Sequence, residues 1–135
     1  MPNVPQNPIY PAPAWQFAPP TNRQIANSFR KMKTGKATRL GTFPNDLYKA
    51  TSNIIVPHLG PIYRATFTLG IYPDDWALNK TIVQRKPGKP DYRILGAHRP
   101  LVLSHGHARG LNGCMADEAT CAAEMLGLIP SRQFG

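Results

Sequence analysis

The sequence predicts an α+β fold in which three to four helices surround one two-stranded β-hairpin. Apolar residues recur at helical spacing over residues 22–33, and a longer stretch with helical character covers 104–126. Between them, two segments rich in β-branched and aliphatic residues, 76–84 and 100–103, flank a loop rich in proline, glycine and cations. Two strand-like segments around such a loop are typical of a β-hairpin.

Length and charge limit the classes of protein that need to be considered. A chain of 135 residues is long enough for one hydrophobic core. Sixteen Lys and Arg against seven Asp and Glu give a formal net charge of +9, which favours polyanionic partners such as nucleic acid or anionic lipid. We find no run of about 18 apolar residues and no signal-peptide pattern, so we expect a soluble intracellular chain without a membrane partner.

Two further features concern the compartment. Cys114 and Cys121 fall in one predicted helix at a spacing that does not suggest a disulfide framework, so we expect reduced thiols. No compact run of about five or more Lys and Arg marks nuclear import. The choice between nucleus and cytoplasm stays open.

Residues 1–20 are expected to form a disordered, Pro-rich arm. They hold seven of the fifteen prolines and no charged side chain. Proline lacks the backbone N–H that a helix or a sheet needs, so neither element is expected here. The alternative is a proline-motif ligand for a partner domain. Trp15 and Phe17 are expected to attach the end of the arm to the core.

The first predicted helix covers residues 22–33. Thr21 is suitably placed to cap its N-terminus. Its apolar face comprises Ile25, Phe29 and Met32. A loop over residues 34–44 follows, because glycine and polar residues replace the helical pattern there.

Two more helices are expected before the hairpin. Pro44 suits the first turn of a helix that ends near Asn53. Two prolines then interrupt the helical pattern, Pro57 and Pro61. A separate helix is therefore expected over 57–69, ended by Gly70. Its core-facing residues are expected to be Leu59, Ile62, Tyr63 and Phe67.

The predicted hairpin carries its charge at the tip, in a loop from about Lys86 to His98. Five cationic side chains lie in or beside this loop: Arg85, Lys86, Lys89, Arg93 and Arg99. Ammonium and guanidinium groups bind phosphates, and the prolines of the loop reduce the entropy lost when it becomes ordered. Composition by itself also allows a solvated basic hairpin that has no ligand.

The last predicted helix covers about 104–126. The residues on its apolar side are expected to be Leu111, Met115 and Met125. Gly110 and Gly113 weaken such a helix, each by roughly 1 kcal/mol relative to Ala. No further element is expected after it.

Four segments in order resemble the N-terminal part of the reverse transcriptase domain of non-LTR retrotransposons of the jockey-like (LINE-type) kind. They are "GKATRLGTFPNDLYKA", "HLGPIYRATFTLGIYPDDWALNKTIVQRKPGKP", "HRPLVLSHGHARGLNGCMADE" and "GLIPSRQFG". The resemblance covers about residues 23–135. It implies that 21–135 is a truncated fingers region of a right-hand RNA-directed DNA polymerase, preceded by the arm.

The resemblance also implies which residues contact phosphate. Lys86 and Arg99 match basic positions near the triphosphate of the incoming nucleotide and the template, with Lys89 in support. Arginine suits this role because its planar fork can hold two phosphate oxygens, whereas lysine acts as a compact point charge. Further supporting basic positions are Arg85, Lys36 and Arg109. Gln133 and Phe134 match the start of a segment that approaches template and nucleotide.

The resemblance places no catalytic residue in this stretch of chain. The parent enzyme would use palm carboxylates that hold two Mg²⁺ ions, and the family pattern puts these carboxylates after Gly135. We therefore expect this chain to need a palm domain, an RNA or DNA template–primer and a deoxynucleoside triphosphate as partners, and to be inactive alone. The alternatives are a non-catalytic nucleic-acid-binding module and a degenerate fragment without function.

Two other groups of residues have the chemistry of metal ligands. The imidazole and thiolate candidates for zinc are His105, His107, Cys114 and Cys121. Their spacing matches no usual structural-zinc pattern, and the two cysteines would lie two helical turns apart, about 10 Å along the axis. Asp74 and Asp75 are adjacent carboxylates for which turn and helix-capping roles are expected. No metal site is therefore predicted.

Overall fold

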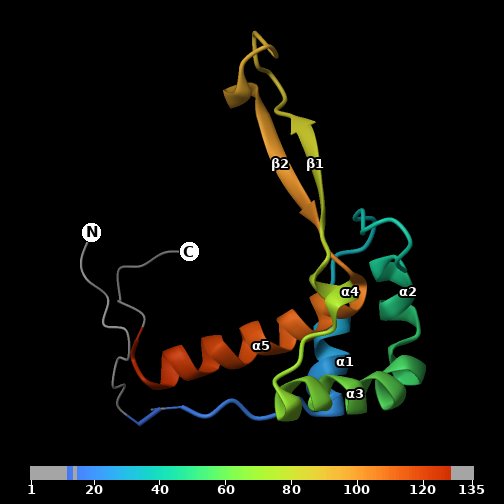
Figure 1. The fold of residues 1–135 in the computed structure, drawn as a ribbon, viewed down its shortest axis with the longest axis vertical. Coiled ribbons are helices and arrows are strands. Elements are labelled where there is room, and N and C mark those ends of the chain that lie inside the picture. The colour runs from blue at the N-terminus through green and yellow to red at the C-terminus, as the bar shows by residue number, and fades with distance from the viewer. Residues whose placement is uncertain (1–11, 14, 129–135) are drawn as a thin grey trace.

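Helices form the body of the protein and one hairpin projects from it, in a computed structural model that describes residues 12, 13 and 15–128 (Figure 1). The elements are α1 (Asn22–Lys31), α2 (Asn45–Ala50), α3 (Ser52–Leu69), α4 (Asp74–Ala77), β1 (Lys80–Arg85), the 3₁₀ helix η1 (Leu95–Ala97), β2 (His98–Leu103) and α5 (Gly106–Met125). The predicted α+β class is confirmed. The described residues contain five α-helices rather than three to four, because α4 is additional.

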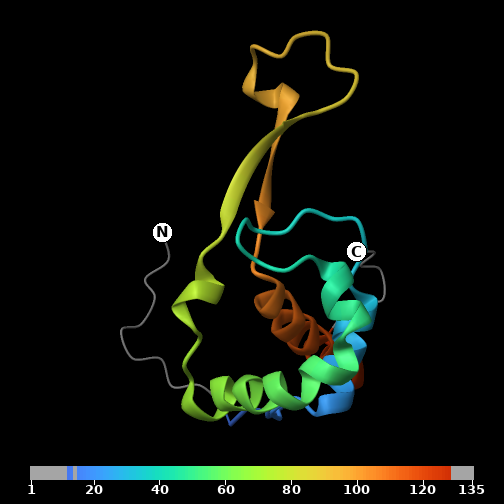
Figure 2. The same cartoon turned by 90° about the vertical axis from the view of Figure 1, so that its right-hand side faces the viewer.

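Helix α1 is the centre of the helical body, since it contacts α2, α3 and α5. Figures 1 and 2 show α3 along the base, α5 above it and α2 upright at one end. The core of the described residues comprises Ile25, Phe29, Tyr48, Val56, Leu59, Tyr63, Trp76, Ala108, Leu111 and Cys114. Met32 and Phe67 are partly buried against it. Most of the predicted core is therefore confirmed.

The N-terminus of α1 is capped as the sequence predicts. The Oγ1 atom of Thr21 accepts the backbone N–H of Gln24 at 3.3 Å. The Oε1 atom of Gln24 accepts the backbone N–H of Thr21 in return at 2.8 Å. This reciprocal pair satisfies two donors that a helix start leaves without partners. In the arm before it, residues 12, 13 and 15–20 have no helix or strand, and residues 1–11 and 14 lie outside the described part.

A single helix, α3, runs through Pro57 and Pro61, so the expected break before Pro57 is wrong. The break falls at Thr51. Its N–H donates to the carbonyl of Leu47 at 2.9 Å and ends α2, while its carbonyl accepts the N–H of Ile54 at 2.9 Å and begins α3. An interior proline costs about 3 kcal/mol. Burial of one face offsets this cost, through Val56, Leu59, Gly60 and Tyr63.

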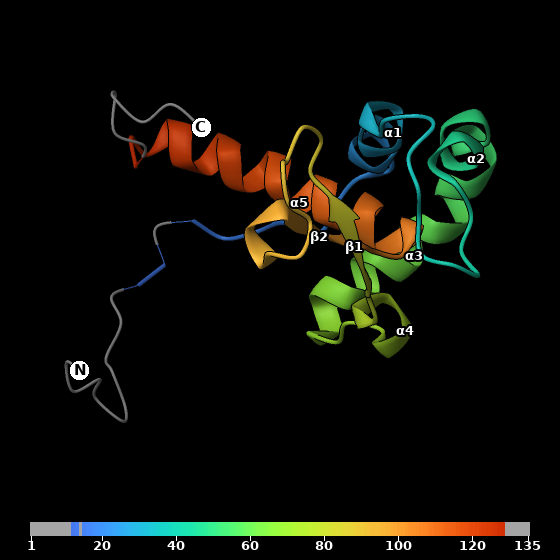
Figure 3. The same cartoon turned by 90° about the horizontal axis from the view of Figure 1, so that it is seen from above.

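Three residues expected in the core are exposed instead: Ile62 (49%), Met115 (42%) and Met125 (70%). Ile62 lies off the buried face of α3, which Leu59 and Tyr63 occupy. Figure 3 shows α5 extending well beyond α1 and α3, and Met125 is the last residue of that helix. The predicted apolar side of α5 is therefore correct only for Leu111.

Helix α4 forms where the sequence predicts the start of a strand. Asp74 and Asp75 occupy its first turn, where carboxylates are favourable to the helix dipole. The turn buries Trp76, which meets the ring of Tyr63 edge to face at a centroid distance of 5.5 Å. The strand itself begins at Lys80. Burial of one large aromatic ring therefore outweighs the strand propensity of this segment.

The predicted hairpin is confirmed as a two-stranded antiparallel sheet. The register runs from Lys80 opposite Leu103 to Arg85 opposite His98, so the second strand starts two residues earlier than predicted. Every side chain of β1 is exposed. Figures 1 and 2 show the hairpin standing away from the helices, with η1 near its distal end.

Helix α5 approaches α1 and α3 closely at Gly110. A Cβ atom at this position would overlap the ring of Phe29 and the hydroxyl of Tyr63. The Oγ atom of Ser28 also donates to the carbonyl of Gly110 at 2.8 Å, in the buried contact between α1 and α5. The missing side chain at Gly110 therefore allows a contact that a larger residue would prevent.

Two more glycines share this side of α5. A Cβ at Gly106 would overlap the ring of Tyr48, and one at Gly113 would overlap the hydroxyl of Ser28. Residues four and three apart lie on one face of a helix, so the glycines together form a flat face for α1 and its neighbours. The interpretation of Gly110 and Gly113 as weak points of the helix misses this packing role.

None of the helices in residues 12, 13 and 15–128 combines the length and the apolar character that a membrane span requires.

We expect the substitution Gly110→Ala to lower the free energy of unfolding by about 1–2 kcal/mol. Overpacking costs about 1–3 kcal/mol, which exceeds the roughly 1 kcal/mol that alanine adds to helix propensity. Urea unfolding followed by circular dichroism measures the change. Gly96→Ala is the control, because a Cβ at Gly96 meets no atom within 4 Å. A Gly110→Ala variant as stable as the parent would contradict the close contact.

Candidate nucleic-acid interface

The hairpin carries a strong excess of positive charge. Residues 80–103 contain one acid, Asp91, and six cations: Lys80, Arg85, Lys86, Lys89, Arg93 and Arg99. Asp91 pairs within the loop, since its Oδ1 atom accepts the Nε–H of Arg93 at 3.1 Å. The other cations stand on a projecting element with little protein around it (Figure 1). Such a surface attracts anions.

Lys86 and Arg99 lie on the same face of the hairpin. Arg99 is opposite Gln84 in the ladder, and directly opposite residues share a face. Lys86 comes two residues after Gln84, and its N–H donates to the carbonyl of Ala97 at 2.8 Å, so the pairing continues past the end of β1. The structure thus brings together the two side chains that the resemblance assigns to phosphate.

The cationic side chains assigned to phosphate differ in how far their positions are fixed by hydrogen bonds. The Nζ atom of Lys86 donates to the carbonyl of Gly96 at 3.0 Å, and the residue is half-buried. An ammonium group has three donors, so two remain for a phosphate. Lys89 and Arg99 are exposed, and within the described part of the chain neither side chain is hydrogen-bonded. Lys86 therefore has a defined position, whereas Lys89 and Arg99 can adjust to a ligand.

Arg85 lies on the opposite face, over an aromatic side chain. Its guanidinium carbon is 5.1 Å from the centre of the Tyr92 ring, within the range of a cation–π contact. Tyr92 also meets the ring of His98 edge to face at 6.1 Å and donates its hydroxyl proton to the carbonyl of Lys86 at 3.0 Å. This face therefore presents flat groups next to a positive charge.

Lys36 and Arg109 form a separate group at the foot of the hairpin, which is the end where β1 and β2 join the helical body. Figure 2 shows the loop between α1 and α2 rising towards that foot. Arg109 donates to the Ser104 hydroxyl (3.0 Å), the Asn45 side-chain oxygen (3.3 Å) and the carbonyl of Ala37 (3.2 Å). It thereby holds the loop that carries the exposed Lys36. A phosphate contact by either residue stays a prediction.

A second set of charges at the foot of the hairpin was not predicted. The Oδ1 atom of Asp75 accepts the Nη2–H of Arg39 at 2.8 Å, and its Oδ2 atom lies 3.3 Å from Nε2 of His105. Asp75 is in α4, just before β1, and His105 follows β2 by two residues. These contacts therefore connect both ends of the hairpin to the loop between α1 and α2. They join residues far apart in the chain, so no local pattern could have indicated them.

Two features favour the neutral form of His105. Its Nδ1 atom accepts the backbone N–H of His107 at 3.1 Å and so caps α5, which leaves the proton of the neutral ring on Nε2, facing Asp75. Burial lowers the pKa of His105 below its ordinary value of 6.5, and Arg39 lowers it further, while Asp75 opposes the shift. Burial also lowers the pKa of His107. Hydrogen bonding to Arg39 lowers the pKa of Asp75, so this carboxylate stays charged.

The four candidate zinc ligands do not form one cluster, although the rings of His105 and His107 lie 4.7 Å apart between their centres. Cys114 is buried, and this burial raises the pKa of its thiol to about 11. Cys121 is exposed, with its Sγ atom 3.8 Å from Sδ of Met125. In the described ranges, 12, 13 and 15–128, we find no group of three or more His, Cys, Asp or Glu side chains that could hold a metal ion.

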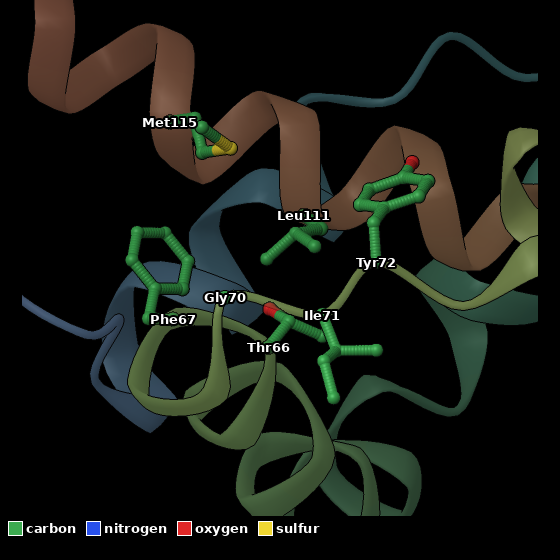
Figure 4. A pocket seen from close by; sticks show the side chains of 7 residues that line it. All are labelled: Thr66, Phe67, Gly70, Ile71, Tyr72, Leu111 and Met115. Atoms are coloured by element: carbon green, nitrogen blue, oxygen red, sulfur yellow. The ribbon is translucent and has the colours of Figure 1, made fainter.

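An apolar hollow of about 200 Å³ lies between the end of α3 and the middle of α5 (Figure 4). Its lining residues are Thr66, Phe67, Gly70, Ile71, Tyr72, Leu111 and Met115. No charged side chain is among them, so this hollow does not suit a phosphate. The two predicted template-side residues, Gln133 and Phe134, lie outside the described residues.

We expect stability to fall as the pH is lowered from about 7.5 to 5. The folded-state pKa values of His105 and His107 lie below 6.5, so the unfolded chain takes up protons first. The stabilisation is fully present above the unfolded pKa and is lost as the pH falls through the folded one. Asp75 contributes only at lower pH, because its pKa lies below 3.8. Urea unfolding across this pH range tests the slope.

His105→Asn should flatten part of this pH dependence, because asparagine can cap a helix but does not titrate in this range. The matched control is His58→Asn on α3, since His58 is exposed. Equal slopes in the parent and in His105→Asn would show that the cap of α5 does not depend on neutral His105.

Comparisons with known proteins do not place the chain in a family. No protein-family model matches it, and no curated protein matches it at a significant level. The similarity to reverse transcriptases therefore stays a prediction from the sequence motifs.

Proposed function

We propose that residues 21–135 are a fingers region of a reverse-transcriptase-type polymerase whose hairpin binds phosphates of a nucleic acid or of a nucleoside triphosphate. One observation carries this proposal. Lys86 and Arg99, which the sequence motifs assign to phosphate, share one face of a hairpin that projects from the helical body. Lys86 and Arg99 are diagonal neighbours across the ladder, and such positions lie roughly 7–8 Å apart, so the two cations can act on one anion.

The charges around this face support the same function. Arg99 and Lys89 are exposed, and Lys86 is oriented by the carbonyl of Gly96. An arginine fork can hold two phosphate oxygens, and a lysine adds a point charge. The one acid of the hairpin, Asp91, is already paired with Arg93. Little negative charge therefore competes with a phosphate at this face.

Binding, not nucleotidyl transfer, is the role we assign to these residues. In the family pattern, transfer belongs to paired palm carboxylates that hold the two Mg²⁺ ions and stabilise charge on the attacking and leaving oxygens. The fingers contribute cations that position the phosphates. A palm domain, a template–primer and a deoxynucleoside triphosphate are therefore the partners that this function requires.

We expect the chain to bind a fluorescently labelled RNA–DNA hybrid with an affinity that falls steeply as salt is raised. Each phosphate contact releases a condensed counterion, so the logarithm of the binding constant falls linearly with the logarithm of the salt concentration. Fluorescence anisotropy at several salt concentrations measures the slope. An affinity independent of salt would contradict phosphate binding.

The variants Arg99→Gln and Lys86→Gln should each reduce the magnitude of that slope by about 0.7 to 1 unit. Glutamine can still donate to the carbonyl of Gly96, so the loop should keep its shape in the second variant. Arg23→Gln is the matched control, because Arg23 is an exposed cation on α1, in the helical body. A slope that changes as much in the control as in the hairpin variants would count against the assigned site.

A further inference from the structure

Two apolar side chains are exposed near the distal end of the hairpin, among the cations. Leu95 is 93% exposed and Ile94 is 56% exposed. They lie at the start of η1, between the loop that carries Lys89 and the strand that carries Arg99. A single exposed leucine needs no explanation. Two adjacent apolar side chains on a projecting cationic element form a surface that combines apolar contact with positive charge.

The backbone holds these side chains in place. The carbonyl of Ile94 accepts the N–H of Ala97 at 3.1 Å and lies 3.3 Å from Nδ1 of His98. The carbonyl of Gly96 accepts Nζ of Lys86 at 3.0 Å. These bonds connect both sides of Leu95 to the strands. Its exposure is therefore part of a defined conformation, and little further ordering is needed for a contact there.

We propose that Ile94 and Leu95 form an apolar wedge that enters between two stacked bases while the surrounding cations hold the flanking phosphates. Apolar side chains such as leucine and isoleucine separate base steps in this way, at a cost of a few kcal/mol per step. Contacts from Arg99 and Lys89 to the backbone would offset that cost. The wedge rests on the proposed function, because it needs a nucleic acid at the hairpin.

The other groups at the distal end favour a nucleic acid over an anionic membrane. Tyr92 precedes Ile94 by two residues, and the guanidinium of Arg85 lies over its ring; flat groups of this kind stack on bases that have been displaced. A membrane anchor needs an extended apolar face. The other strongly exposed apolar side chains of the hairpin, Val83 and Val102, lie on the strands and not in the segment of Ile94 and Leu95. A gap between two bases, in contrast, accepts a single side chain.

The wedge is tested with a duplex that has a single-stranded overhang and carries 2-aminopurine in place of the base at the junction. The fluorescence of 2-aminopurine rises when the base is unstacked. We expect saturating protein to raise its fluorescence by about two-fold or more. Leu95→Ser should abolish the rise and leave the salt slope of binding unchanged. Leu95→Met, which keeps an apolar side chain, should retain the rise.

Leu69→Ser is the matched control, since Leu69 is 66% exposed at the end of α3, in the helical body. It should behave as the parent does. The high exposure of both leucines makes unfolding by either substitution unexpected, and a thermal melt of each variant verifies this.

The possible results separate the wedge from the proposed function. Loss of binding or of its salt dependence in the parent chain overturns the proposed function and the wedge with it. Salt-dependent binding without a rise in fluorescence, or with the same rise in Leu95→Ser, overturns the wedge alone. Binding to phosphatidylserine vesicles that is lost in Leu95→Ser, without any fluorescence change on the duplex, also overturns it and assigns the two side chains to a lipid surface.

Discussion

The close approach of α5 to α1 and α3 fixes the positions of the other elements. Gly106, Gly110 and Gly113 remove side chains from the contact face of α5, so aromatic rings and the Ser28 hydroxyl can lie directly against the helix. The N-terminus of α5 is thereby held within the helical body. Strand β2 leads into that N-terminus, so the position of α5 also sets where the hairpin leaves the body.

A polar network then attaches the hairpin to the body. Asp75 connects α4, which leads into β1, with His105, which caps α5 and follows β2. The same carboxylate pairs with Arg39 from the loop between α1 and α2. Trp76 anchors this region against Tyr63 and the core. These contacts hold the hairpin where it leaves the helical body. The strands pack mainly on each other, and every β1 side chain is exposed, so the attachment at this end positions the distal cations.

Elements with strong local patterns could be predicted well. The cap at Thr21, the hairpin with its cationic loop and the long final helix each follow from residue types at short spacing. The shared face of Lys86 and Arg99 follows from strand alternation once the register is known. The continuous α3 could not be predicted. The free-energy cost of its two prolines is visible in the local sequence, whereas the burial that offsets this cost depends on contacts with other helices. Helix α4 and the exposure of Ile62 and Met115 have the same kind of origin.

The α+β class, the excess of positive charge, and the concentration of that charge in one proline-stiffened loop between two strands all follow from the order of the residues. Composition, periodicity and turn residues act over a few positions, so they are visible without a structure. Three other features come from packing: the glycines of α5 are contact points, Arg109 and Asp75 bind neighbouring segments, and Leu95 is exposed in the cationic hairpin. Each of these depends on which distant residues lie within a few ångströms, and the packing of the whole chain sets those distances.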